Sequence, residues 1–218
     1  ATDGGAHVTV SPKTWTHTCT GSNLLLFVGL VTSAGAGTWS APTYNSVTMT
    51  QIGTEVFNGN AERISLYYLI NPATGANTVS AAFTGTGNHT GSSVSYTGAL
   101  QSGVPDATAE GTTVGTTRTQ SVTSVADNCW LMGLFVGAGL GASAGAGTTL
   151  RVRTNDNTVW NLGALVDKNA VITPPGAATV IGEDSFGTNP WASIGATFAP
   201  AADVAAPRAQ FLTLLGVR

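Results

Sequence analysis

Residues 141–145 (GASAG) have the G-x-S-x-G spacing that presents the nucleophile of serine hydrolases. That chemistry requires a strand, a tight turn and then a helix, so that the serine faces a histidine. The residues that follow, 148–153 (TTLRVR), have the character of a strand instead. We therefore expect a glycine-rich loop here and no hydrolase nucleophile at Ser143.

An overlapping segment, residues 137–142 (GAGLGA), has the G-x-G-x-x-A spacing of a dinucleotide-binding loop, with Asp156 nearby. Such a loop binds pyrophosphate at the N-terminus of a crossover helix. No helical pattern follows this segment. We therefore expect no dinucleotide cofactor.

The remaining residues that could do chemistry are dispersed. The 11 Asp and Glu residues are isolated, so none forms the pair of convergent carboxylates that a glycosidase needs. His7, His17 and His89 are too far apart in sequence to indicate a zinc site. Residues 155–157 (NDN) could offer oxygens to calcium, but an Asx-rich turn between strands is the commoner meaning. The sequence predicts no enzyme, no catalytic residues, no cofactor and no metal.

Exposed aromatic side chains would favour a carbohydrate-binding module, because sugars stack on Trp and Tyr rings. The candidates are Trp39, Tyr44 and Trp160, which lie near two glycine-rich loops. Aromatic residues make up only 7% of the chain, which is few for a sugar-binding platform. Three further tryptophans have core contexts: Trp15, Trp130 and Trp191.

Charge is scarce in this sequence. Charged residues make up 9% of the chain, whereas an ordinary soluble domain has about 25%. With 42% hydrophobic residues in short runs, the chain is predicted to fold rather than to remain disordered. A surface of hydroxyls and amides costs little to desolvate, which suits either contact with other proteins or an extracellular environment.

The same composition argues against two classes of partner. The net charge is −3, and the eight Lys and Arg residues are scattered, so we expect no nucleic-acid binding. The longest apolar run, residues 24–31, is far too short to span a bilayer, so we expect no membrane insertion. Cys19 and Cys129 could form a disulfide between the two halves of the chain, but two separate buried thiols are the favoured alternative.

Strand signals recur at short intervals, and turn clusters such as residues 71–75 (NPATG) and 173–176 (TPPG) separate them. No window longer than about ten residues keeps a helical apolar period. We therefore predict an all-β protein with very little helix. The expected strands are residues 7–10, 24–31, 47–52, 64–70, 78–83, 93–97, 119–125, 130–136, 149–153, 159–162, 164–166 and 192–198.

Two related halves are indicated by a repeated pattern. The segment SAGAGT occurs at residues 33–38 and again at 143–148, and LFVG precedes each copy. Sliding the chain by about 110 residues lays residues 48–53 on 158–163, although composition alone could produce such a match. Each half also has one nearly apolar strand, 64–70 or 130–136, as expected for a central strand buried on both faces. We predict a single jelly-roll β-sandwich of two antiparallel sheets with pseudo-repeated halves, covering residues 1–199.

Several ordered segments resemble a broad group of jelly-roll domains with a concanavalin A or laminin G-like build, over about residues 6–199. These segments are residues 14–18 (TWTHT), 21–29 (GSNLLLFVG), 44–49 (YNSVTM), 66–75 (LYYLINPATG), 93–98 (SVSYTG) and 127–131 (DNCWL). Such domains are common in tailed phages and in environmental bacterial sequences. The resemblance implies a capsid decoration protein or a tail or fibre component, and it brings no catalytic residue.

Residues 200–218 are predicted to form an extended C-terminal tail. Residues 200–207 have the composition of an extended linker, and five apolar side chains follow between Phe211 and Val217. A linker of about ten residues spans at most roughly 35 Å, which reaches an adjacent subunit. The tail could lie back on its own domain as an edge strand beside residues 7–10, or it could cross to a neighbouring copy, and we expect it to contact another chain.

Together these observations predict a non-enzymatic virion structural protein, either a capsid decoration (cement) protein or a tail or fibre component. It would self-associate, with a trimer favoured, and pack on other virion proteins such as the major capsid or tail protein. The alternative is a secreted carbohydrate-binding or adhesive module with a surface glycan as its ligand.

Overall fold

Antiparallel strands make up most of the structure. The computed structural model describes residues 2–4, 11–33, 37–60, 62–86, 88–138, 143–154, 161–176 and 178–201. None of these residues is helical, which confirms the all-β prediction. It follows that the described part of the chain has no helix long and apolar enough to cross a membrane.

The strands divide between the two halves of the chain. The first half contains β1 (Thr2–Gly4), β2 (Lys13–Cys19), β3 (Leu25–Ser33), β4 (Gly37–Trp39), β5 (Thr43–Tyr44), β6 (Val47–Thr48), β7 (Thr50–Phe57), β8 (Arg63–Ile70), β9 (Gly75–Ala81), β10 (Phe83–Gly85) and β11 (Asn88–Tyr96). The second half contains β12 (Ala107–Thr123), β13 (Trp130–Ala138), β14 (Ser143–Ala144), β15 (Thr148–Thr154), β16 (Asn161–Lys168) and β17 (Ala178–Phe198).

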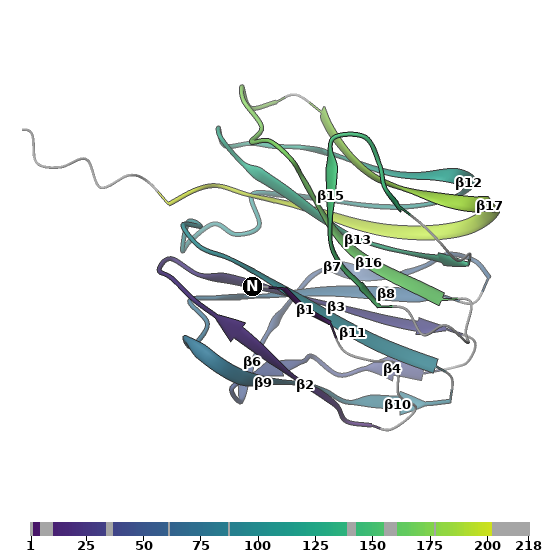
Figure 1. Cartoon of the computed structure of the whole chain (residues 1–218), viewed down its shortest axis with the longest axis horizontal. Coiled ribbons are helices and arrows are strands. Elements are labelled where there is room, and N and C mark those ends of the chain that lie inside the picture. The colour runs from purple at the N-terminus through teal and green to yellow at the C-terminus, as the bar shows by residue number, and fades with distance from the viewer. Residues whose placement is uncertain are drawn as a thin grey trace, which may run out of the picture.

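Two main sheets pack face to face as a β-sandwich (Figure 1). The first has the strand order β1-β11-β3-β8-β7, and the second has the order β12-β17-β13-β16-β15, with β14 added beside β17. Buried side chains from both sheets, such as Phe27, Leu66, Leu134 and Ile194, form the central core. The sheets approach closely at Gly29, where a Cβ atom would lie 2.8 Å from Cδ1 of Leu134. The predicted sandwich is confirmed.

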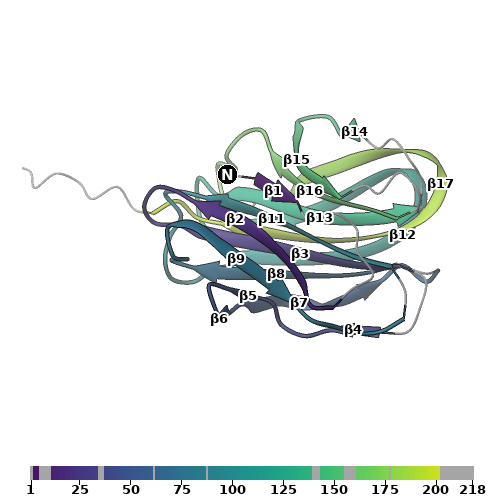
Figure 2. The same cartoon turned by 60° about the horizontal axis from the view of Figure 1, so that its bottom comes forward.

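Each main sheet is also covered on its outer face (Figures 1 and 2). Over the first sheet lie the sheet β2-β9-β5-β6 and the pair β4-β10, which enclose a second core. The second sheet is covered by its own strands, because the ribbon of β12 and β17 bends at a register shift between Gly115 and Thr117. The far half of this ribbon then packs on the sheet, where Ile181 lies against Gly133 and Val122 lies against Gly195.

The jelly-roll connection that we predicted is not confirmed. In a jelly roll, successive strands pass between the two sheets. Here the main strands from residues 2–96 stay in one sheet, and those from residues 107–198 stay in the other. The predicted pseudo-repeat is visible in this arrangement. When β3, β7, β8 and β11 are matched in chain order with β13, β15, β16 and β17, both sheets have the same strand order.

The sequence alignment of the two halves nevertheless has the wrong register. It lays residues 51–53 of β7 on residues 161–163 of β16, whereas the strand order matches β7 with β15. In the repeated LFVG segment, Leu26 faces the outer core, but its counterpart Leu134 faces the central core. Strands that are buried on both faces are apolar at nearly every position, so the pattern does not fix which residues face which side.

Most predicted strands are present, but their bounds differ, and the short strands β1, β4, β5 and β14 were not predicted. Strand β2 was not predicted, because polar residues alternate through it and two of them, Lys13 and His17, point inward and are buried. Strands β12 and β17 are much longer than the predicted 119–125 and 192–198. The expected strand at residues 7–10 and the tail beyond residue 201 lie outside the described residues.

Cys19 and Cys129 are both free and fully buried. Cys19 belongs to the outer core over the first sheet, and Cys129 belongs to the outer core over the second. The central core lies between these two clusters, so a disulfide between the halves is ruled out. The alternative of two separate buried thiols is confirmed.

Gly91 in β11 is a point of close approach between the outer layer and the first sheet. A Cβ atom here would lie 2.5 Å from Cη2 of Trp15, whose Nε1 donates to Ser93 Oγ at 2.9 Å. We expect Gly91→Ala to lower the free energy of unfolding by about 1–3 kcal/mol in urea denaturation, because the fixed indole must move. Gly115→Ala is the control, since its Cβ would meet nothing closer than 3.7 Å. Equal losses in the two variants would contradict this packing.

Candidate functional site

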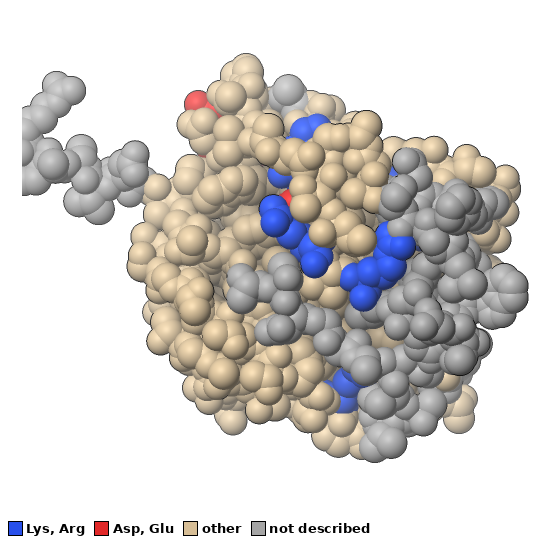
Figure 3. All heavy atoms as spheres, in the orientation of Figure 1, with Lys and Arg blue, Asp and Glu red and all other residues tan. Residues whose placement is uncertain are grey.

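A cavity of about 420 Å³ is lined by residues of both main sheets. Four strands, and the residue that follows β16, contribute polar and aromatic side chains to it. These are Tyr96 of β11, Trp130 of β13, Arg151 of β15, Asp167 and Lys168 of β16, and Asn169. In Figure 3, Lys and Arg side chains gather near the middle of the face that is turned to the viewer, and most of the remaining described surface is uncharged.

Asp167 is the central polar residue of this cavity, and it is only 4% exposed. Its Oδ2 accepts hydrogen bonds from Tyr96 Oη at 3.0 Å and from Arg151 Nε at 2.6 Å. Its other oxygen, Oδ1, is buried and accepts no hydrogen bond. A buried carboxylate oxygen without a donor is costly unless a water molecule or a ligand group supplies one.

A β-bulge brings Arg151 to the carboxylate. Leu150 pairs with Val166 and Val152 pairs with Leu165, so Arg151 is the extra residue on β15. Bulges of this kind redirect a side chain out of the regular alternation. The ion pair that results joins a 40% exposed guanidinium to an almost fully buried carboxylate.

Electrostatics keep these groups in defined protonation states. Burial raises the pKa of Tyr96 well above 10.0, and the negative charge of Asp167 raises it further. The hydrogen bond to Asp167 raises the pKa of Arg151. At neutral pH, therefore, a neutral phenol and a charged guanidinium both donate to the carboxylate.

An aromatic cluster packs against the residues that line the cavity. Phe198 lies at the end of β17, with its ring centroid 5.3 Å from Trp130, 4.8 Å from Tyr96 and 5.4 Å from Phe27. These tilted contacts lie in the range of favourable aromatic pairs. The walls at Tyr96 and Trp130 are thus held by the central core.

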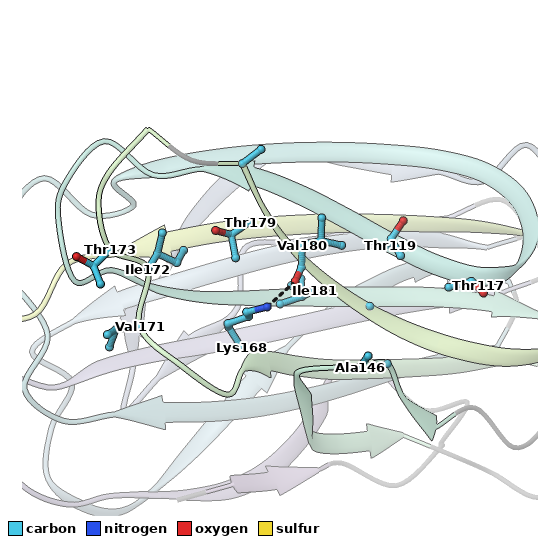
Figure 4. A pocket seen from close by; sticks show the side chains of 13 residues that line it. Thr117, Thr119, Ala146, Lys168, Val171, Ile172, Thr173, Thr179, Val180 and Ile181 are labelled. Atoms are coloured by element: carbon cyan, nitrogen blue, oxygen red, sulfur yellow. Dashed lines mark hydrogen bonds between the residues drawn. The ribbon is translucent and has the colours of Figure 1, made fainter.

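A second cavity, of about 580 Å³, adjoins the first, and both are lined by Lys168 and Val171. Figure 4 shows its lining, where Lys168 Nζ donates to the carbonyl of Val180 at 3.4 Å. Four threonines contribute to its walls: Thr117, Thr119, Thr173 and Thr179. The two cavities together form a polar groove beside Lys168.

A histidine and two serines meet outside the cavity: His17 lies in hydrogen-bond contact with Ser93 Oγ at 2.9 Å and with Ser95 Oγ at 3.0 Å. His17 and Ser93 are fully buried, so neither can reach a substrate. Among the described residues, no three His, Cys, Asp or Glu side chains form a group that could hold a metal ion.

Stability is expected to fall at alkaline pH because two buried acids resist ionisation. Burial, reinforced by the charge of Asp106, raises the pKa of Cys129 from 9.0 to about 12, and the pKa of Tyr96 is also raised. The folded protein therefore keeps protons that the unfolded chain releases. The free energy of unfolding has its full value below pH 9.0 and falls as the pH rises toward about 12. Urea denaturation at a series of pH values should show the decline, and Cys129→Ala should make it shallower. An unchanged slope in that variant would contradict the assignment to Cys129.

The residues proposed from sequence for sugar stacking do not form this site. Tyr44 is fully buried, and its hydroxyl donates to backbone carbonyls such as that of Ala73, so its prediction as an exposed platform is wrong. Trp39 is half-buried and packs on Phe83 and His89. Three other candidates lie outside the described residues: Trp160, the segment 155–157, and residues 139–142 of the two glycine-rich motifs.

The core assignment of tryptophans was right for Trp191 but incomplete for Trp130, which is half-buried and lines the cavity. Tyr96, Arg151 and Asp167 were not selected from the sequence. Tyr96 and Asp167 are 71 residues apart, and only the sandwich brings them together. The one local signal is the Asp-Lys pair that ends the apolar run of β16, and such a pair also marks an ordinary strand end.

Comparisons with protein-family models, with curated proteins and with solved structures find no match to this chain.

Proposed function

We propose that this protein is a non-enzymatic structural component of a phage-like particle, which self-associates as a capsid decoration protein or as part of a tail or fibre. The observation that carries the proposal is the long, uncharged edge of β12. In this role the protein would reside in the virion and pack on the major capsid or tail protein as well as on copies of itself.

Strand β12 has 17 residues, and within the described part of the chain it pairs only with β17. The two charged residues of β12 do not protect this edge against pairing with another strand. Glu110 accepts hydrogen bonds from Thr54 N at 2.6 Å and Thr54 Oγ1 at 3.0 Å, and Arg118 is fully buried. Val114 is 60% exposed. Monomeric proteins usually protect such edges with charges, prolines or bulges, because unpaired backbone groups recruit another strand.

Strand β7, at the edge of the first main sheet, is protected against pairing with a further strand. Its pairing with β8 is interrupted between Ile52 and Val56. Glu55 forms an ion pair with Arg63 at 2.9 Å, and the Arg63 guanidinium lies 4.5 Å from the ring centroid of Phe57. A distorted, charged edge resists strand addition. The contrast supports β12 as the edge for self-association, although β12 has a register shift of its own between Gly115 and Thr117.

The proposed occupant of the β12 edge is the apolar segment 211–217 of a neighbouring copy. The described chain ends beside the start of β12, because Thr197 pairs with Ala107 and Ala201 N donates to Gly98 O at 2.7 Å. A linker of about ten residues reaches roughly 35 Å, far enough to cross to the next molecule. Such head-to-tail exchange closes into a ring when the rotation between copies is a whole fraction of a turn and forms a filament when it is not, and we propose a ring of three.

Light scattering on the purified full chain tests this proposal directly. We expect a mass that is a multiple of 21.9 kDa, with the trimer favoured. A mass of 21.9 kDa at every concentration would contradict self-association. Negative-stain images of material from the native source would then distinguish a particle or filament from a free secreted protein.

A second candidate function is a secreted carbohydrate-binding or adhesive module. The observation that favours it is the cavity beside Asp167, in which a buried carboxylate oxygen, an indole and two cationic side chains meet. Binding of a surface glycan is compatible with the structural role, since particle proteins can also attach to surfaces.

A further inference from the structure

We propose that the groove beside Asp167 binds a neutral oligosaccharide, with one sugar ring in the cavity at Trp130 and Asp167 and the next ring or rings along Lys168. This inference rests on the second candidate function, for which it specifies the ligand, and it uses none of the residues that carry the assembly role.

The first argument is the unfilled acceptor. Asp167 is almost fully buried, and Oδ2 already accepts two hydrogen bonds while Oδ1 accepts none. Tyr96 and Arg151 fix the carboxylate, so Oδ1 cannot turn away to solvent without breaking both of these bonds. Asp167 lines the cavity, and because Oδ1 is covered in this structure, the cavity wall must adjust before a ligand hydroxyl can donate to it.

The second argument is the charge around the acceptor, which selects against ions. A cationic ligand that approached Oδ1 would also meet Arg151 and Lys168, which line the same cavity. An anionic ligand drawn to those two side chains would meet the carboxylate of Asp167. A pair of vicinal hydroxyls satisfies both kinds of group, because one hydroxyl donates to the carboxylate while its neighbour accepts from a cationic N–H.

The third argument is the aromatic wall. Trp130 is half-buried, lines the cavity and is held in place by Phe198. The C–H face of a sugar ring packs on such an indole while its hydroxyls reach the polar side. A volume of about 420 Å³ lies in the range of small-molecule sites, and it is large enough for one sugar ring.

The fourth argument sets the length of the ligand. The adjoining cavity of about 580 Å³ shares Lys168 and Val171 with the first. Threonine hydroxyls line it, and they both donate and accept, as sugar hydroxyls do. A ligand that follows the groove from one cavity to the other must be longer than a single sugar.

Isothermal titration calorimetry of the full chain with maltohexaose, cellohexaose, xylohexaose, mannohexaose and N-acetylchitohexaose tests the proposal. We expect at least one of these neutral oligosaccharides to bind, and its monosaccharide to bind at least about tenfold more weakly. Asp167→Asn should weaken binding at least about tenfold, because the acceptor becomes an amide.

Ala170→Trp is the second variant, and it does not depend on Asp167. Ala170 is exposed and lines the cavity, so the indole fills the site without disturbing the core. Ala41→Trp, at an exposed residue that lines neither cavity, is the matched control. We expect Ala170→Trp to abolish binding and Ala41→Trp to leave it unchanged.

Three outcomes would overturn the proposal. They are no binding of any of the five oligosaccharides up to about 10 mM, binding that survives Ala170→Trp, and binding restricted to sulfated or sialylated probes run in parallel. Repeating the titration on a monomeric β12 variant separates this proposal from the assembly role, because the cavity lies on other strands and should bind equally well there.

Discussion

Lysine at position 112 or 114 of β12 is expected to reduce the assembled protein to a monomer of 21.9 kDa. Thr112 and Val114 are exposed on the unguarded edge, and neither is part of a buried core. A charge there would have to be desolvated when a second strand pairs, which is how natural edge strands avoid association. Light scattering and sedimentation at several concentrations would measure the change.

Val125→Lys is the matched control, because Val125 is 74% exposed and follows the end of β12. It adds the same charge without touching the edge, and it should assemble like the unmodified protein. If Val125→Lys dissociates the assembly as strongly as Val114→Lys, the effect is one of net charge and the β12 edge is not the contact.

Deleting residues 210–218 tests whether the tail segment is the partner of the edge. If the two meet, the deletion and Val114→Lys should weaken assembly by similar amounts, and the combined variant should be no weaker than either alone. The sandwich should stay folded in all three, as checked by urea denaturation. Full assembly of the deletion variant would show that the edge pairs with another segment.

Phe198→Ala is expected to cause the largest loss of stability, about 3–5 kcal/mol, because it removes the centre of a buried aromatic cluster. Phe198 is fully buried and contacts Phe27, Tyr96 and Trp130. Domains unfold with a total free energy of only about 5–15 kcal/mol, so this change removes a large share. Urea denaturation followed by tryptophan fluorescence would measure it.

Phe57→Ala provides the comparison for that variant. Phe57 is 42% exposed on β7, where its ring meets the guanidinium of Arg63. Its loss should cost about 1 kcal/mol or less. Similar losses in Phe57→Ala and Phe198→Ala would mean that the aromatic cluster is not the centre of the core.

The sequence contains enough information for the fold class and for the buried central strands. Residues 64–70 and 130–136 are almost wholly apolar, and both are central strands of the main sheets. These features are local, because a run of apolar side chains is buried whichever strands come to lie beside it.

Which strands pair, and in which register, was decided by the tertiary structure. The halves each keep their main strands in one sheet instead of exchanging them, and the LFVG segments face opposite sides despite their identical sequence. Pairing partners depend on packing between residues that are far apart in the chain, and an all-apolar strand fits either face equally well. Sequence periodicity therefore cannot select among them.

The candidate site depends entirely on that long-range choice. Asp167 meets Tyr96 across the sandwich and meets Arg151 through a single bulge residue in β15. Each of these residues alone looks like an ordinary strand residue, and the unfilled oxygen of Asp167 arises only when all three come together. The sequence by itself determined a charge-poor, all-β, two-part protein. The tertiary structure decided where the buried carboxylate of Asp167 and its partner Arg151 would lie, because burial and donor count are properties of the assembled sheets.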